Sequence, residues 1–264
     1  MSPALVASRA NDGTEVAVEI AGRGPPLVLV HGTSSSAARW QPVRARLEAS
    51  FTLYVVERRG RGASGDGTEH SLGLEVDDLA GVLGSIGSPA FVIGHSFGGL
   101  IALEAVRAHA MRALVVYEPP IPVRGPVYPD GALARFEALL ESGRDEEVVV
   151  SFFRDVLRAD DAMLARTRSL PSWPSRVRAA RTLPREVRAT DGYAWDARRF
   201  ADVSTHVTFL FGGDSGPLVR ELTHSVAAAF PAHAVRELPG QRHVAMDTAP
   251  DLFVDTVLAA FGVA

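Results

Sequence analysis

Short apolar runs rich in β-branched residues recur along the chain, and longer stretches with helical spacing separate them. Such runs predict strands that are buried on both faces, because a strand with one solvated face would alternate apolar and polar residues. The predicted strands are Pro26–Val30, Phe51–Val56, Ala90–Ile93, Ala113–Tyr117, Val207–Phe211 and Ala234–Leu238.

Between the strands, apolar residues recur three or four positions apart, as on one face of a helix. The clearest such segment runs from Leu72 to Ile86, and a second continues from Ser96 through Leu100 and Ala105. Strands that alternate with helices predict βαβ units with right-handed crossovers, and hence an α/β fold with a mostly parallel sheet.

A final apolar face, from Leu252 to Phe261, predicts the closing helix of the core. Thr248 and Asp251 stand in capping-box spacing just before it, with Pro250 in the first turn. We therefore expect a helix that is capped by the side chain of Thr248.

The alternation is interrupted over residues 119–205, where the sequence becomes helical, contains 14 arginines and is punctuated by prolines. We expect a helical cap inserted into a core made of residues 1–118 and 206–264. Its arginines, including Arg176 and Arg178, are predicted to form a solvated face, with attraction of an anionic substrate as the alternative. Its aromatic residues are predicted to pack the cap, with a pocket lining as the alternative: Phe152, Phe153, Trp173, Tyr193 and Trp195. Arg181 belongs to the same basic face.

The composition narrows the possible chemistry. The 264 residues carry a net charge of -4 and a pI near 6.1, so no basic field favours nucleic acid as a partner. The absence of cysteine removes disulfides, thiolate nucleophiles and sulfur-ligated metals. The first residues lack the pattern of a secretory signal, and no segment holds about 18 uninterrupted apolar residues, so we expect a cytoplasmic protein with no membrane partner.

The segment VIGHSFGG places Gly94, Ser96 and Gly98 in GxSxG spacing between a predicted strand and a predicted helix. A serine on a sharp strand-to-helix turn needs very small neighbours, because only these let the strand and the helix close around it. Its hydroxyl is then presented to a pocket. We therefore predict that Ser96 is a catalytic nucleophile.

A serine nucleophile also needs donors directed at the oxyanion that forms during acyl transfer. In LVLVHGT, Gly32 lets the chain turn after the strand, and the backbone amide of Thr33 can point inward. The amide of Phe97, directly after Ser96, is the second predicted donor. His31 is predicted to be a structural part of this turn.

The general base is predicted to be His243, which lies in LPGQRHVAMD between the last predicted strand and the last helix. A side chain there can reach back over the edge of the sheet. His95 adjoins the serine but leaves the turn in a different direction, so it is predicted to be structural. The remaining histidines are expected at surface or packing positions: His70, His109, His206, His224 and His233.

The acid that orients the base should follow a strand between the serine and the histidine. Asp214 fits, since THVTFLFGGDSG runs from a strand into a glycine turn, where a short buried carboxylate could accept the imidazole proton. Glu118, in VVYEPP at the end of another strand, is the alternative acid. The sequence favours Asp214 and leaves Glu118 open.

Taken in order, five motifs resemble the active-face motifs of the α/β-hydrolase superfamily: LVLVHGT, ERRGRGASG, GHSFGG, LFGGDSG and LPGQRHVAMD. The resemblance covers the core from about Glu15 to Phe261. It implies an eight-stranded, mostly parallel sheet with helices on both faces, a Ser-Asp-His triad and a helical cap. Glu57 stands where the family more often has aspartate, in a turn that is usually structural.

The expected activity is two-step hydrolysis of a small acyl substrate, namely a carboxylic ester, lactone or thioester, with no metal or organic cofactor. Perhydrolases, carbon-carbon bond hydrolases and amidases of this superfamily use the same triad and remain alternatives. A noncatalytic small-molecule receptor is the alternative from another class. Halide displacement and epoxide opening are disfavoured, because such enzymes of this fold usually carry a carboxylate nucleophile where Ser96 stands.

Overall fold

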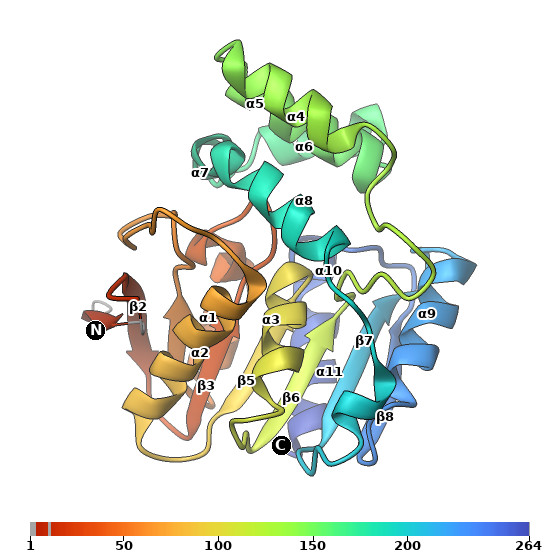
Figure 1. Ribbon diagram of the computed structural model, residues 1–264. Coiled ribbons are helices and arrows are strands. Elements are labelled where there is room, and N and C mark those ends of the chain that lie inside the picture. Colours follow the sequence, from red (N-terminus) through yellow and green to blue (C-terminus); the bar gives the residue numbers. More distant parts are fainter. Residues whose placement is uncertain (1–3, 10–11, 264) are drawn as a thin grey trace.

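The computed structural model of the chain describes residues 4–9 and 12–263, and these are organised around one eight-stranded sheet (Figure 1). The strand order is β1-β2-β4-β3-β5-β6-β7-β8. β2 pairs antiparallel with both β1 and β4, and the pairs from β4 and β3 through to β8 are parallel, as the resemblance implies. The strands are β1 (Ala4–Arg9), β2 (Glu15–Gly22), β3 (Pro26–Val30), β4 (Thr52–Val56), β5 (Phe91–His95), β6 (Ala113–Tyr117), β7 (Val207–Gly212) and β8 (His233–Leu238).

Successive residues of the central strands point to opposite faces, and both faces are covered by helices. In β3, Val28 and Val30 belong to the apolar cluster under α2, α3 and α9, whereas Leu27 and Leu29 belong to the cluster under α1 and α11. Figure 1 shows α2 and α3 in front of the sheet. The core helices are α1 (Gln41–Glu48), α2 (Leu72–Ile86), α3 (Phe97–Ala105), α9 (Pro217–Ala227), α10 (Ala245–Thr248) and α11 (Pro250–Phe261), with a short 3-10 helix η1 (Ala37–Trp40).

The closing helix α11 forms where it is predicted, but its expected cap does not. The N-cap residue is Ala249, which offers no side-chain hydrogen bond, and the hydroxyl of Thr248 donates instead to the side-chain oxygen of Gln241, at 2.6 Å. The capping-box prediction is therefore wrong, because the preceding turn forms a separate short helix, α10, that ends at Thr248.

Residues 119–205, the cap segment, lie between β6 and β7 and place several helices above the carboxyl ends of the parallel strands (Figure 1). The cap segment has an apolar cluster of its own, which includes Phe152, Phe153 and Trp173. Tyr193 and Trp195 instead pack against the sheet cluster, Trp195 by stacking on Phe200 at 4.9 Å between ring centroids. The elements are α4 (Ala132–Glu141), α5 (Asp145–Ser151), a π-helical turn η2 (Phe152–Val156), α6 (Asp161–Arg168), α7 (Trp173–Arg178), η3 (Ala179–Thr182), α8 (Leu183–Asp191) and η4 (Ala197–Phe200).

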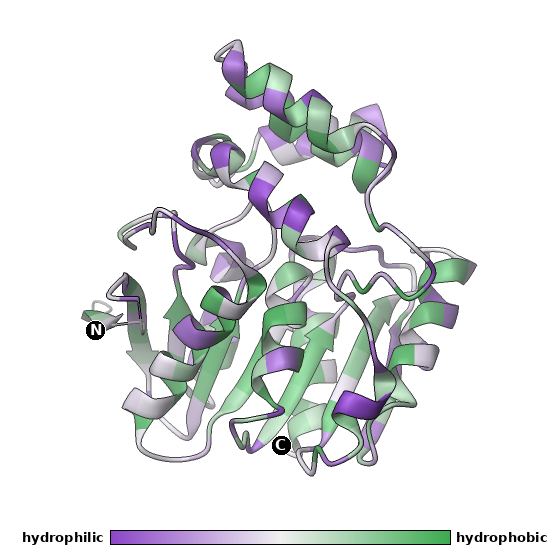
Figure 2. Ribbon diagram, viewed as in Figure 1, coloured by the Kyte–Doolittle hydropathy of each residue, from purple (hydrophilic) through white to green (hydrophobic). Residues whose placement is uncertain are grey.

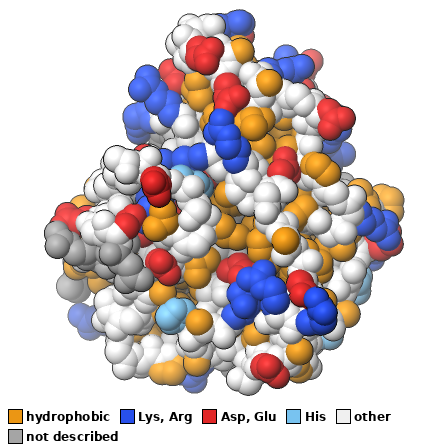
Figure 3. Space-filling view, viewed as in Figure 1, with side chains coloured by type: hydrophobic (Ala, Val, Ile, Leu, Met, Phe, Trp, Pro, Cys, Tyr) orange, Lys and Arg blue, Asp and Glu red, His pale blue; other side chains and the backbone are white. Residues whose placement is uncertain are grey.

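Polarity differs between the sheet and the cap segment. Figure 2 shows strongly hydrophobic strands beneath a more hydrophilic α8, and Figure 3 shows basic and acidic side chains interspersed over the upper helices. Arg178 and Arg181 are exposed, as a solvated face requires, but Arg176 is buried, which corrects the prediction for that residue. Among the helices of the described residues, none combines the length and the apolar character that a membrane crossing demands.

Candidate active site

Ser96 lies at the junction between β5 and α3, in a backbone conformation that L-residues rarely adopt. Its φ is 53° and its ψ is -125°, and its amide donates to the carbonyl of Tyr117 on the neighbouring strand, at 2.9 Å. Strained conformations of this kind concentrate at functional sites, where the surrounding structure holds them. Ser96 therefore sits on the sharp strand-to-helix turn that its sequence motif predicts.

The glycines around Ser96 are required by space. A Cβ on Gly94 would lie 2.6 Å from the carbonyl oxygen of Gly98, and a Cβ on Gly98 would lie 2.3 Å from that of Val30. Neither neighbour is a flexible side chain, so a larger residue would force the strand and the helix apart. The GxSxG spacing is therefore explained by the close approach of β5, α3 and the end of β3.

The loop after β3 passes directly beside Ser96. A Cβ on Gly32 would lie 2.7 Å from the Ser96 Cβ and 3.3 Å from its Oγ, so only glycine fits there. Thr33, the next residue, is buried. The loop that carries the predicted oxyanion donor, the amide of Thr33, therefore lies next to the nucleophile.

His31 is fixed as part of that loop. Its Nδ1 donates to the carbonyl of Gly32 at 3.0 Å, and its Nε2 accepts from the amide of Arg58 at 3.3 Å. Complete burial, and then the charges of Arg58 and Arg61, lower the pKa of His31 well below its ordinary value. A neutral imidazole with both nitrogens engaged is consistent with the predicted structural role.

His243 lies in the loop between β8 and α10, and two core side chains hold its position. His95 Nε2 donates to the His243 carbonyl at 2.8 Å, and the hydroxyl of Tyr117 donates to the carbonyl of Arg242. The rings of His95 and His243 lie 4.7 Å apart between centroids. His95, adjacent to the nucleophile, thus anchors the loop that carries the predicted base.

Glu118, directly after β6, accepts a hydrogen bond from the imidazole. Its Oε2 lies 2.6 Å from His243 Nδ1, and its Oε1 accepts from the amide of Gly212 at 2.8 Å and the hydroxyl of Ser215 at 2.6 Å. Burial would raise the pKa of Glu118, but the hydrogen bond and charge of His243, with those two further donors, hold it below the ordinary value. The carboxylate is therefore kept ionised against the imidazole.

Asp214, the acid that the sequence favours, does not meet His243. It is exposed, and its amide donates to the carbonyl of Gln241 at 2.8 Å. The expectation of a short buried carboxylate at this position is corrected, because the glycine turn after β7 directs Asp214 to solvent. The same turn contributes Gly212 and Ser215 as donors to Glu118, the alternative acid.

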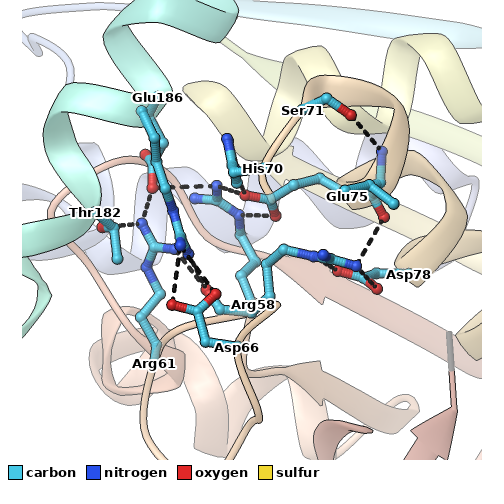
Figure 4. A network of polar contacts seen from close by, with 12 residues as sticks. Arg58, Arg61, Asp66, His70, Ser71, Glu75, Asp78, Thr182 and Glu186 are labelled. Carbon is cyan, nitrogen blue, oxygen red and sulfur yellow. Dashed lines mark hydrogen bonds and ion pairs between the residues drawn. The ribbon is translucent and has the colours of Figure 1, made fainter. Parts of the chain in front are cut away.

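A buried charge network fixes the turn after β4 and joins it to α8 of the cap segment (Figure 4). Arg58 pairs with Glu75 at 2.6 Å and lies 3.4 Å from Glu186, which also pairs with Arg61. Arg58 in addition donates to the carbonyl of Gly32 at 3.2 Å. The ERRGRGASG segment therefore supports the loop beside the nucleophile.

Glu57 and the remaining histidines lie in a structural turn, in an ion pair or at the surface. The side chain of Glu57 accepts from the amide of Ala37 at 3.1 Å, in agreement with a structural role for its turn. The side chain of His70 is 5% exposed and pairs with Glu75 at 2.9 Å, while His206, His224 and His233 are exposed. Ser215 and Arg58 were not singled out from the sequence; a hydroxyl one residue after a predicted acid is the signal that points to Ser215.

Comparisons with known proteins place the fold in a family. A family model described as an alpha/beta hydrolase family matches residues 27–256. Among solved structures, an alpha/beta hydrolase from Sphaerobacter thermophilus DSM 20745 is 32% identical, with a TM-score of 0.85 over 97% of this chain and 100% of that one.

Two curated relatives match shorter segments. A pimeloyl-[acyl-carrier protein] methyl ester esterase of Stenotrophomonas maltophilia (strain K279a) is 36% identical over 88 residues, which is 33% of each chain. An N-formylmaleamate deformylase of Pseudomonas putida is 33% identical over 105 residues, which is 38% of this chain and 39% of that protein. The matched segments thus span 33% and 39% of the length of these relatives.

Proposed function

Since the chain belongs to the alpha/beta hydrolase family, we propose that it is a serine hydrolase of carboxylic esters, with Ser96 as nucleophile, His243 as base and Glu118 as acid. The observation that carries the proposal is the 2.6 Å hydrogen bond between His243 Nδ1 and a buried carboxylate. That bond fixes the tautomer in which Nε2 is free to accept a proton. Homologous esterases and hydrolases support the reaction class.

In the proposed mechanism, Ser96 Oγ attacks the ester carbonyl carbon while His243 Nε2 takes the hydroxyl proton. The amides of Thr33 and Phe97 stabilise the oxyanion, and Glu118 stabilises the imidazolium. When the tetrahedral intermediate collapses, the carbon-oxygen bond breaks and His243 returns the proton to the leaving alcohol. A water molecule then attacks the acyl enzyme by the same steps, which releases the acid and restores Ser96.

Esters, including lactones and thioesters, are the first candidate substrates, because the groups in this site are sufficient to hydrolyse them. The methyl ester esterase among the relatives supports this choice. The deformylase relative keeps amide hydrolysis as the second candidate, because an amide needs only stronger protonation of its leaving nitrogen by the same imidazole. Perhydrolysis and carbon-carbon bond hydrolysis remain alternatives for the same triad.

The proposal is tested by labelling with a serine-reactive fluorophosphonate and by turnover of p-nitrophenyl acetate. We expect one adduct, on the peptide that contains Ser96, and a loss of turnover of about 10⁴-fold or more in Ser96→Ala and in His243→Ala. Ser169→Ala, at an exposed serine of the cap segment, is the matched control and should label and turn over like the wild type.

Two results would overturn the proposal. One is a Ser96→Ala variant that folds and retains activity within about threefold of the wild type. Members of a triad act as one unit, so loss of the nucleophile alone should remove most of the turnover. The other is a wild-type protein that binds the ester without turnover and without labelling, which would favour the noncatalytic receptor instead.

A further inference from the structure

Arg176 is a cap arginine whose side chain is directed into the core, toward the loop beside Ser96. It lies on α7, is only 5% exposed, and its Nη1 donates to the carbonyl of Ser34 at 2.9 Å. Its guanidinium lies 5.5 Å from the centroid of the Phe153 ring. The cap segment thus inserts a cation between its own apolar cluster and the active-site loop.

Arg176 differs from the other buried arginines of the described residues in having no carboxylate partner. Arg58 pairs with Glu75 and Arg61 with Glu186 in the network below α8 (Figure 4). Arg59 pairs with Asp78. Arg39 pairs with Asp247 at 2.7 Å. Buried charges are normally paired, because an unpaired charge removed from water is costly. The exception therefore calls for a functional explanation.

The charges around Arg176 do not compensate for its missing carboxylate partner. Burial, and then the like charge of Arg39, lower the pKa of Arg176 to about 9, while the opposing charge of Asp247 is already paired with Arg39. The Nε of Arg176 has no hydrogen-bond partner among the described residues. A guanidinium is built to hold a carboxylate through two adjacent N–H groups, and this one has an edge that the protein does not use.

The position of Arg176 places that edge within reach of the reacting centre. Ser34 follows Gly32 by two residues, and two residues span at most about 7 Å. A Cβ on Gly32 would lie 3.3 Å from Ser96 Oγ. The hydroxyl of Ser34 is also buried without a hydrogen-bond partner among the described residues. The loop that Arg176 contacts at Ser34 is therefore the same loop that passes beside Ser96 at Gly32.

We propose that Arg176 binds a carboxylate carried by the substrate, so that the preferred substrates are esters of short dicarboxylic acids with one free carboxylate. The free carboxylate would lie a few atoms from the scissile carbonyl and would supply the partner that Arg176 lacks. This inference rests on the proposed function for the identity of the reacting group. It adds a specificity residue and a substrate class.

The test compares two activated esters of equal chain length, mono-p-nitrophenyl glutarate and p-nitrophenyl valerate. We expect the wild type to prefer the anionic ester in kcat/KM, and Arg176→Met to lose at least about tenfold on it, as expected for hydrogen bonds to a charged group. The valerate should change by less than about threefold in the same variant. Arg176→Lys keeps the charge but not the two adjacent N–H groups of the guanidinium. Its kcat/KM on the glutarate ester should fall between those of the wild type and Arg176→Met.

Arg178→Met is the matched control, because it removes the same charge from the same helix at an exposed position. It should leave the preference unchanged. If Arg176→Met lowers kcat/KM equally for both esters, then Arg176 acts only through the Ser34 loop, and the inference is overturned. A wild type that hydrolyses both esters equally would also overturn it, while the Ser96-dependent turnover of valerate would leave the proposed function intact.

A binding measurement separates the two proposals. Monomethyl glutarate, which has one free carboxylate, and methyl valerate, which has none, are titrated calorimetrically into Ser96→Ala and into Ser96→Ala with Arg176→Met. Binding of monomethyl glutarate that requires Arg176 supports the carboxylate site even if neither p-nitrophenyl ester is hydrolysed by the wild type, in which case only the proposed function fails. Equal binding of monomethyl glutarate to both proteins overturns the carboxylate site.

Discussion

The ends of β6 and β7 present two carboxylates on neighbouring strands, and only the one on β6 contacts the imidazole. The Glu118 side chain is 7% exposed and accepts three hydrogen bonds, from His243, Gly212 and Ser215. Asp214 is exposed, and the structure gives it a backbone contact to Gln241. A position at the carboxyl end of a strand is therefore not sufficient to identify the acid that orients His243. The hydrogen-bond donors that converge on a carboxylate identify it.

Backbone geometry and side-chain length account for the difference. β6 adjoins β5, the strand that carries Ser96, whereas β7 lies one strand further away, about 4.8 Å per strand. Glu118 has a φ of 45° immediately before Pro119, a conformation that is unfavourable for a residue with a side chain. The fold accepts this strain where it directs a long carboxylate toward His243.

The largest expected effect is that of Glu118→Gln. The amide keeps the size of the side chain but favours the wrong imidazole tautomer, a change that costs roughly 10⁴ in turnover in the best-known serine triad. Turnover of p-nitrophenyl acetate measures it, and the circular dichroism spectrum should show a folded protein. Activity within about tenfold of the wild type would remove Glu118 from the triad.

A smaller effect is expected for Ser215→Ala. The variant removes one of the two donors to Glu118 Oε1 and leaves the amide of Gly212 in place. A hydrogen bond to a charged group is worth about 1.5–3 kcal/mol, so we expect a loss in kcat/KM of about tenfold to hundredfold, with little change in KM. Ser142→Ala, at an exposed serine, is the control. A loss as large as that of Glu118→Gln would mean that Ser215 has a direct role.

Stability should also depend on pH through Glu118. Its pKa in the folded protein lies below the ordinary 4.5, so folding favours the ionised form. That contribution is fully present above the unfolded pKa and is lost as the pH falls through the lower folded pKa. Urea unfolding between about pH 6 and pH 3 should show a steeper loss of stability in the wild type than in Glu118→Gln. Parallel curves would contradict the assigned ionisation.

Most of the fold could be predicted from the sequence, because the buried strands are uninterrupted apolar runs and the turn at Ser96 needs glycines at fixed spacing. The acid could not be chosen, because both candidates follow buried strands and the pattern does not show which way a side chain points. The LFGGDSG motif was located, but its contribution to the observed contacts is Gly212 and Ser215 rather than Asp214.

The cap segment illustrates the same limit. Arginines in a helix are normally solvated, and Arg178 is, but Arg176 lies three residues after the buried Trp173 and therefore on the same helical face. That three-residue spacing from Trp173 is the sequence signal that could have distinguished the buried Arg176 from the exposed Arg178. Whether a buried arginine has an acidic partner depends on residues far apart in the chain. Only the structure reveals that Arg176 has none among the described residues and that Arg61 pairs with Glu186.

The smallest effect is expected for Asp214→Asn, and it is the sharpest test of the comparison. The substitution keeps the size of an exposed side chain and leaves untouched the backbone amide that donates to Gln241. Because His243 Nδ1 hydrogen-bonds to Glu118 while Asp214 is exposed, kcat/KM on p-nitrophenyl acetate should stay within about twofold of the wild type. Stability should change by about 0.5 kcal/mol or less, as for other surface substitutions. The result has meaning only beside Glu118→Gln, measured on the same substrate. If Asp214→Asn is the inactive variant and Glu118→Gln the active one, the acid belongs on β7, and the loop of His243 must adopt a second arrangement during catalysis, since Nδ1 cannot direct its single proton to both carboxylates at once.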